Sequence, residues 1–149
     1  MAKEELRQRA IRLLAQRDHS RAELTRKLSS HGSADEVAEV VARMAALELQ
    51  SDRRFAEQYV RSRGARFGAQ RLRRELRQRG IDDELGARAI ADALEGDEID
   101  RAQRVWQARF GDAPHDPKEW ARQARFLQYR GFSADIIHTV LKGRFDEPA

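Results

Sequence analysis

Apolar residues recur along this chain at the spacing of an α-helix. Leu6, Ala10 and Leu13 lie three or four positions apart, and similar stripes, separated by polar breaks, follow along the rest of the sequence. Residues spaced in this way line one face of a helix. The alternation of apolar and polar residues that a strand would show is almost absent. The pattern therefore predicts an all-α protein.

Two Ser-x-x-Glu sequences indicate where the second and third helices begin. Ser20 precedes Glu23, and Ser33 precedes Glu36, in each case just before an apolar stripe. In such a capping box the serine side chain accepts from the backbone N–H of the glutamate, and the carboxylate accepts from that of the serine. Three helices therefore fit before residue 49.

The same pattern returns twice further along the chain. Gly32, Gly80 and Gly131 lie 48 and 51 residues apart, and each follows a leucine by four positions. Glycine is favoured there because the residue after a helix often takes the left-handed conformation. The period predicts tandem three-helix repeats that pack on their neighbours in an elongated, curved arrangement. The predicted repeats and the C-terminal tail span residues 1–48, 49–96, 97–145 and 146–149.

The residues that usually carry catalysis or hold a cofactor form no recognisable motif. There is no cysteine, and glycine-rich phosphate-binding motifs are absent. The histidines do not have the spacing of metal ligands, so we interpret each as a surface or capping residue; they are His19, His31, His115 and His138. We expect a protein that is not an enzyme and that needs neither metal nor cofactor.

The N-terminus and the hydropathy pattern bear on location. "MAKEELRQRA" is charged from its third residue, unlike a secretory signal, and no apolar run approaches the roughly 18 residues that cross a bilayer. We therefore expect a cytoplasmic protein that does not enter a membrane, and we expect it to be a monomer.

Charge is distributed unevenly along the sequence. From residue 61 to residue 80, eight arginines stand against Glu75, a balance of +7. From residue 81 to residue 100, eight acidic residues stand against Arg88, a balance of −7. The net charge of +4 conceals this polarity, which favours a partner that offers charges of both signs.

The basic residues are densest in "QRLRRELRQRG", residues 70–80. If Leu72 and Leu76 define the buried face of a helix, most of the arginines point outward. Glu75 is placed to pair with Arg71 and Arg79, which leaves three arginines without a local acid. We predict a surface that recognises anions, and a face that is merely soluble remains the alternative. The candidate contact residues are Arg61, Arg63, Arg66, Arg71, Arg73, Arg74 and Arg77.

Aromatic residues that alternate with arginines can stack on nucleic-acid bases. Phe55 with Tyr59, and Trp106 with Phe110, coincide with the apolar stripes, so we assign these pairs to the core. The roles of the aromatic residues near the C-terminus stay open, because they crowd a short helix; they are Trp120, Phe126 and Tyr129.

DNA is the first anion to consider, because three-helix units with a glycine turn resemble helix-turn-helix modules. However, the helix expected at residues 83–94 carries acids rather than side chains that read bases, and a duplex would repel the acidic segment. A protein that itself coats DNA fits better. Two alternatives remain: a small basic DNA-binding protein, and an adaptor whose acidic segment, residues 82–100, docks a basic partner.

Four segments together resemble the RecX family, regulators of the bacterial RecA recombinase. They are "AIRLLAQRDHSRAELTRKL", "DRRFAEQYVRSR", "RLRRELRQRGID" and "RFLQYRGFS", and the resemblance covers residues 10–144. Two departures affect turns. The family's Gly-aromatic-Leu-Asp-Asp turn is "ELQSD" here, keeping only Asp52, and its Gly-Pro is Gly68-Ala69.

The resemblance implies tandem three-helix repeats and a protein that is not an enzyme. It implies binding in the helical groove of the RecA filament on single-stranded DNA, with inhibition of ATP hydrolysis, strand exchange and co-protease activity. Direct, weak contact of basic side chains with the DNA is a further expectation.

Overall fold

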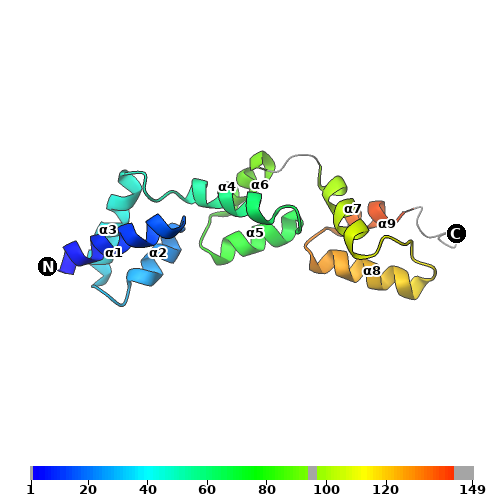
Figure 1. The fold of residues 1–149 in the computed structure, drawn as a ribbon, viewed down its shortest axis with the longest axis horizontal. Helices are drawn as coiled ribbons and strands as arrows, with labels where there is room; N and C mark the ends of the chain where they lie inside the picture. The colour runs from blue at the N-terminus through cyan, green and yellow to red at the C-terminus, as the bar shows by residue number, and fades with distance from the viewer. Residues whose placement is uncertain (1, 94–96, 143–149) are drawn as a thin grey trace. The chain divides into compact units, whose positions relative to one another are not determined.

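The computed structural model describes residues 2–93 and 97–142, and this part of the chain contains nine α-helices and no strand (Figure 1). The prediction of an all-α fold is confirmed. The predicted tail, residues 146–149, lies outside the described residues. The helices are α1 (Ala2–Gln16), α2 (Arg21–Leu28), α3 (Ala34–Ala46), α4 (Asp52–Arg63), α5 (Ala69–Gln78), α6 (Asp83–Ala93), α7 (Glu98–Arg109), α8 (Pro117–Tyr129) and α9 (Ala134–Leu141).

Helices α1, α2 and α3 form the first three-helix repeat, in which each helix packs on the other two. Both predicted capping boxes are present: Ser20 and Glu23 begin α2, and Ser33 and Glu36 begin α3. The apolar stripes of the three helices meet in one core. Its side chains include Leu6, Leu24, Leu28, Val41 and Met44.

Helices α7, α8 and α9 form the third repeat around a separate core. Trp106 and Leu127 are buried there, as the periodicity predicts. Gln123 takes the place of an apolar residue in the repeat pattern and is nevertheless 3% exposed. Its Oε1 accepts from Trp106 Nε1 at 2.8 Å, and its Nε2 donates to the Asp112 carbonyl at 3.2 Å. Both ends of the buried amide are therefore hydrogen-bonded, which removes most of the cost of burying it.

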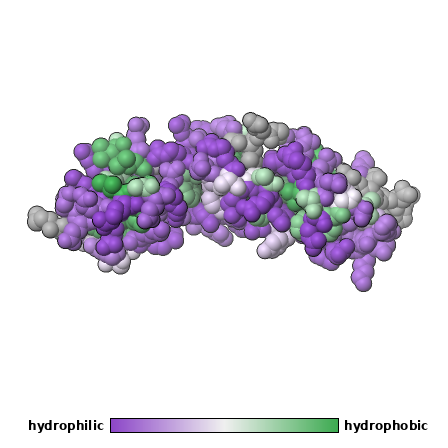
Figure 2. Space-filling view, viewed as in Figure 1, coloured by the Kyte–Doolittle hydropathy of each residue, from purple (hydrophilic) through white to green (hydrophobic). Residues whose placement is uncertain are grey.

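The chain divides into two compact units, and the divisions between them fall inside the middle helices. Within the described residues, one unit extends to Tyr59 and includes Glu75–Ala89, and the other comprises Val60–Arg74 and the chain from Ile90 onward. Helices α4 and α5 each contribute residues to both units. Hydrophilic residues cover most of the face shown in Figure 2.

In the first unit, the turn after α5 packs against the start of α2. Ser20, the N-cap of α2, donates through Oγ to the Arg79 carbonyl at 2.6 Å. Gly80 has a φ of +83°, and a Cβ at this position would overlap Ala22. Left-handed backbone and close approach therefore both require glycine here.

The second unit repeats this junction between the turn after α8 and the start of α5. The N–H of Gly68 donates to the Arg130 carbonyl at 2.8 Å, and that of Gln70 donates to the Gly131 carbonyl at 3.2 Å. Gly131 has a φ of +99°. The same contact therefore recurs in both units. In each, the glycine turn that follows the second helix of one repeat packs on the first residues of the second helix of the preceding repeat.

The prediction of a left-handed glycine is confirmed at Gly80 and Gly131 and is wrong at Gly32. Helix α2 ends at Leu28, so Gly32 stands four residues beyond the helix, whereas Gly80 stands two residues beyond the end of α5. The longer turn moves Gly32 away from the position that needs the left-handed conformation. It is instead enclosed by Leu6, whose Cδ1 would lie 2.6 Å from a Cβ at this position.

Candidate arginine-rich interface

The predicted contact residues lie on the end of α4, the following loop and α5. Leu72 and Leu76 are buried, at 0% and 1% exposure, which fixes the inner face of α5 as expected. Arg73, Arg74 and Arg77 are exposed on the same helix. Arg61 and Arg66 are also exposed, whereas Arg63 and Arg71 are half-buried.

The structure brings four arginines around the ring of Phe67 in the second unit. The guanidinium carbon of Arg71 lies 4.1 Å from the ring centroid, that of Arg63 4.7 Å, that of Arg130 5.3 Å and that of Arg66 5.6 Å. Phe67 itself is 8% exposed. Each contact has the distance of a cation–π interaction, worth about 0.5–1 kcal/mol at an exposed site. Three of the predicted contact residues thus belong to one cluster.

Arg130 belongs to this cluster, and the sequence analysis missed it. It is the C-cap of α8, and its Nη1 donates to the Arg66 carbonyl at 3.3 Å. The turn at Gly131 places it there by docking on α5. The only sequence signal was its position directly before the repeated glycine.

The expectation that Arg77 lacks a local acid is wrong. Its Nε lies 2.9 Å from Asp83 Oδ1, because the short turn after α5 returns the first residue of α6 to its side. Both side chains are well exposed, at 62% and 68% of their area. An exposed pair of this kind contributes only about 0–1 kcal/mol, so a partner's anion can compete for Arg77.

Glu75, the single acid of the arginine-rich segment, lies in the first unit. Its carboxylate accepts a hydrogen bond from the Tyr59 hydroxyl at 2.6 Å. Arg79 donates to the Glu75 carbonyl at 3.0 Å and stacks on the Tyr59 ring at 4.7 Å. Phe55 is buried as expected, whereas Tyr59 is half-buried and stacks on it with ring centroids 5.9 Å apart, so the assignment of this pair to the core is confirmed only for Phe55.

Carboxylates of the acidic segment begin helices. Asp82 accepts from the backbone N–H of Glu84 at 2.8 Å at the start of α6, and Asp97 accepts from that of Asp100 at 2.9 Å at the start of α7. Glu84 also pairs with Arg88 at 3.6 Å. Negative charge is favourable at helix N-termini, so part of this acidity has a structural role.

Arg101 is the one buried arginine among the described residues, at 5% exposure. Its Nη2 lies 3.8 Å from Glu98, whose carboxylate also accepts from the backbone N–H of Ala69 at 2.5 Å. Burial lowers the pKa of Arg101, and the charge of Glu98 opposes that shift. Glu98 therefore ties the start of α5 to α7 through the Ala69 N–H, which a proline at residue 69 would not provide.

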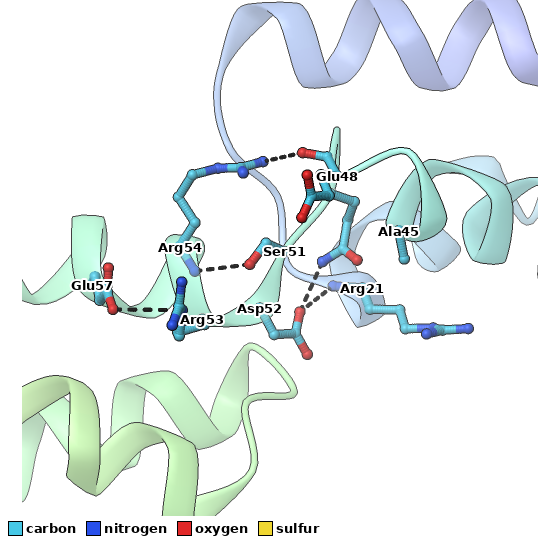
Figure 3. Close-up of a pocket in the computed structure, with 9 residues that line it drawn as sticks. Arg21, Ala45, Glu48, Ser51, Asp52, Arg53, Arg54 and Glu57 are labelled. Atoms are coloured by element: carbon cyan, nitrogen blue, oxygen red, sulfur yellow. Dashed lines mark hydrogen bonds and ion pairs between the residues drawn. The ribbon is translucent and has the colours of Figure 1, made fainter.

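A polar pocket lies at the turn between α3 and α4 (Figure 3). Asp52 Oδ1 accepts from the Arg21 N–H at 2.7 Å and from Gln50 Nε2 at 3.0 Å. Arg54 donates to the Glu48 carbonyl at 3.1 Å and to Asp18 at 3.2 Å. These charged groups hold the turn together, so we assign the pocket a structural role rather than a ligand.

Three of the four histidines are exposed as expected, and the expectation of a surface position is wrong for His19. His19 is 1% exposed, with Nδ1 3.0 Å from the Arg17 carbonyl and Nε2 3.2 Å from Lys27 Nζ. Burial lowers the pKa of His19, and the neighbouring cations Arg17 and Lys27 lower it further. Within residues 2–93 and 97–142 there is no cluster of metal-ligating side chains, and every helix is too short or too polar to span a membrane.

Family models for the domains of RecX proteins match nearly the whole chain. The model of the first three-helix domain matches residues 7–44, that of the second matches residues 51–94, and that of the third matches residues 96–141. These matches confirm the three tandem three-helix repeats expected from the sequence.

Whole-length comparisons agree with the domain matches. The regulatory protein RecX of Chromobacterium violaceum is 44% identical over 144 residues, which cover 95% of this chain and 92% of that protein. The RecX of Leptothrix cholodnii is 43% identical over 138 residues, covering 92% and 87%. The crystal structure of RecX from Lactobacillus salivarius has the same fold, with a TM-score of 0.79 at 23% identity over 95% of both chains. This chain therefore belongs to the RecX family of regulatory proteins.

Proposed function

We propose that this chain binds the RecA filament on single-stranded DNA, along its helical groove, and inhibits the recombinase, ATPase and co-protease activities of RecA. Membership of the RecX family is the observation that carries the proposal. Through this inhibition the protein would regulate DNA repair and the SOS response. The proposed role is not enzymatic and needs no cofactor, and we place the protein in the cytoplasm as a monomer.

The proposed contact surface is the set of arginines on α4, the following loop and α5. Arg73 and Arg74 are exposed and form no ion pair within residues 2–93 and 97–142, and α5 is held at its start by backbone bonds from Gly68 and Gln70. A guanidinium on a fixed helix can meet a carboxylate or a phosphate in a planar, two-bonded geometry. The repeats at 1–48, 49–96 and 97–145 would each add a section of the surface that follows the groove.

The distribution of charge supports a filament as partner. Adjacent segments carry balances of +7 and −7, and a filament presents the same charged groups on successive subunits. Complementary charges of this kind favour encounter and fix the register of a complex.

The test is inhibition of RecA ATP hydrolysis on single-stranded DNA. In a double variant, Arg73→Glu with Arg74→Glu, we expect half-inhibition to require at least about tenfold more protein, because close charge pairs at interfaces are worth several kcal/mol. The matched control is Arg9→Glu with Arg12→Glu, which makes the same change in charge at exposed positions of α1. Identical inhibition curves for the first double variant and the unmodified protein would refute the proposed surface.

The alternative function, DNA binding without RecA, is separated by a second comparison. It predicts affinity for bare DNA at physiological salt that equals the affinity for RecA-coated DNA and falls steeply as salt is raised. Our proposal predicts that the RecA-coated DNA is preferred.

A further inference from the structure

We infer that Tyr129 forms a stacking site for an unpaired base of single-stranded nucleic acid, with the neighbouring arginines holding the phosphates. The site lies within the second unit and shares Arg66 and Arg71 with the candidate contact residues, but it does not include Arg73 and Arg74, whose replacement tests the proposed function. The inference does not depend on the proposed regulation of RecA, because it concerns bare nucleic acid.

The first observation is the exposure of the ring. Tyr129 is the last residue of α8, and 71% of it is exposed. Among the described residues, the next most exposed large hydrophobic side chain is Leu47, at 48%. The other large apolar side chains of α8, Trp120, Phe126 and Leu127, contribute to the core of the third repeat. Tyr129 therefore does not serve the packing of α8.

The second observation is a ladder of alternating ring and guanidinium. The Arg71 guanidinium carbon lies 4.1 Å from the Phe67 centroid and 5.1 Å from the Tyr129 centroid. Phe67 is almost buried at one end, and Tyr129 is exposed at the other. A planar base added to the open face of Tyr129 would extend this ladder, because rings and guanidinium groups stack on bases of any sequence.

The third observation is that hydrogen bonds hold the backbone at and after Tyr129. Arg71 Nη1 donates to the Tyr129 carbonyl at 3.2 Å. The N–H groups of Gly68 and Gln70 bind the carbonyls of Arg130 and Gly131, directly after Tyr129. These bonds fix the backbone that carries the ring, so that binding a base would require no ordering of this segment.

The fourth observation is the positive charge around the ring. Arg130 directly follows Tyr129 in the chain, and its guanidinium carbon lies 5.3 Å from the Phe67 centroid and 5.0 Å from the Phe126 centroid. Neither Arg66 nor Arg130 forms an ion pair within the described residues. Arg125, one helical turn before Tyr129, is exposed. These cations can neutralise the phosphates that flank a stacked base, a contact that makes affinity depend on salt.

The occupant is single-stranded rather than duplex nucleic acid. A base within a duplex is stacked on both faces and presents no free face to Tyr129. An anionic protein surface is the rival occupant, because Tyr and Arg are also enriched at protein interfaces, and failure of the chain to bind bare single-stranded nucleic acid would favour it.

The experiment measures fluorescence anisotropy of a labelled 20-nucleotide oligothymidylate with the full chain, in the absence of RecA and at low salt. We expect Tyr129→Ala to weaken binding about tenfold, and Tyr129→Phe to keep it, because stacking needs the ring and not the hydroxyl. Leu49→Ala, which truncates another exposed side chain, is the matched control and should leave binding unchanged. Thermal melting by circular dichroism checks that each variant is folded.

Three outcomes would overturn the inference. They are failure of the unmodified chain to bind the oligothymidylate, equal binding by the Tyr129→Ala variant, and a duplex of the same length bound with the same dependence on Tyr129. A second readout is photocrosslinking to an oligonucleotide that carries 5-iododeoxyuridine, for which we expect Tyr129 as the modified residue. Because RecA is absent from these assays, their failure would leave the proposed inhibition of RecA untouched, and the ATPase assay tests that separately.

Discussion

Gly131 lies against Arg71 so closely that any side chain on residue 131 would overlap the Arg71 backbone and Cβ. The contact joins the turn after α8 to the first turn of α5, and Gly80 makes the corresponding contact with Ala22. In both places a left-handed glycine brings a helix turn onto the start of another helix. The recurring feature is thus a backbone contact, which depends on the lack of a side chain.

The first prediction concerns Gly131. Replacing it with alanine adds left-handed strain at a φ of +99° and a clash with Arg71, so we expect a loss of about 2–3 kcal/mol in the free energy of unfolding, measured with urea. Gly111→Ala is the control, because Gly111 has a φ of +74° but its nearest neighbour, Gln107, would lie 3.5 Å from the new Cβ. Equal losses for the two variants would show that the contact with Arg71 contributes nothing.

The second prediction concerns the two serine caps. Ser33 is exposed and only caps α3, so Ser33→Ala should cost about 1 kcal/mol. Ser20 is 0% exposed and also donates to the Arg79 carbonyl. Ser20→Ala should therefore cost about 2–3 kcal/mol, because the carbonyl loses its donor inside the protein. Urea unfolding of both variants tests the difference, and a cost for Ser20→Ala no larger than that for Ser33→Ala would contradict it.

The third prediction concerns Glu48, which follows α3 with a φ of +60°. Arg54 donates a hydrogen bond to the backbone carbonyl of Glu48 and not to its side chain. A glycine therefore keeps that bond and relieves the left-handed strain. We expect Glu48→Gly to stabilise the protein by about 0.5–1 kcal/mol after the greater freedom of glycine in the unfolded chain is included. Glu48→Ala removes the same carboxylate but keeps the Cβ, so its melting temperature should not rise as that of Glu48→Gly does.

The fourth prediction concerns pH and His19. Because burial and nearby cations lower the pKa of His19, the folded protein binds fewer protons there than the unfolded chain. Stability from this group is complete above its unfolded pKa of about 6.5 and is lost as the pH falls below that value. The urea midpoint should therefore be lower at pH 5.5 than at pH 8.

Two variants check the assignment to His19. His31→Gln alters an exposed histidine and should keep the difference between the two pH values, whereas His19→Gln should abolish it. The pKa of Glu36 is also lowered, by hydrogen bonds from Ser33, but its contribution is lost only below its ordinary value of 4.5. A midpoint that is the same at pH 5.5 and pH 8 in the unmodified protein would contradict the prediction.

Local features of the sequence were sufficient for most of the fold. Helix starts at Ser20 and Ser33, the turns at Gly80 and Gly131, and the buried faces of the helices follow from contacts between residues a few positions apart. The repeat spacing then indicates how many three-helix units the chain contains. Such features depend on residues that are neighbours in the sequence, and for this reason periodicity and capping patterns predicted them.

The arginine-rich interface was predicted only in part. The outward direction of Arg74 follows from the helical period alone, whereas that period places Arg73 nearer the core boundary and the structure shows it exposed. The partner of Arg77 depends on a turn that returns Asp83 to its side, and the spacing of arginines along α5 does not show it. Arg130 was missed, and the role of Tyr129 stayed open, because they reach Phe67 and Arg71 from a segment about sixty residues further along the chain.

By itself the sequence determined the all-α class, the three repeats and the dense basic segment, because each is written in residue type and local spacing. Tertiary structure decided which polar groups are buried, as at His19 and Gln123, and which aromatic ring is left exposed, as at Tyr129. These outcomes depend on the neighbours that a folded chain brings to a side chain from distant segments. The physical reason is that burial and pairing are properties of a site in space, whereas helix periodicity is a property of the chain.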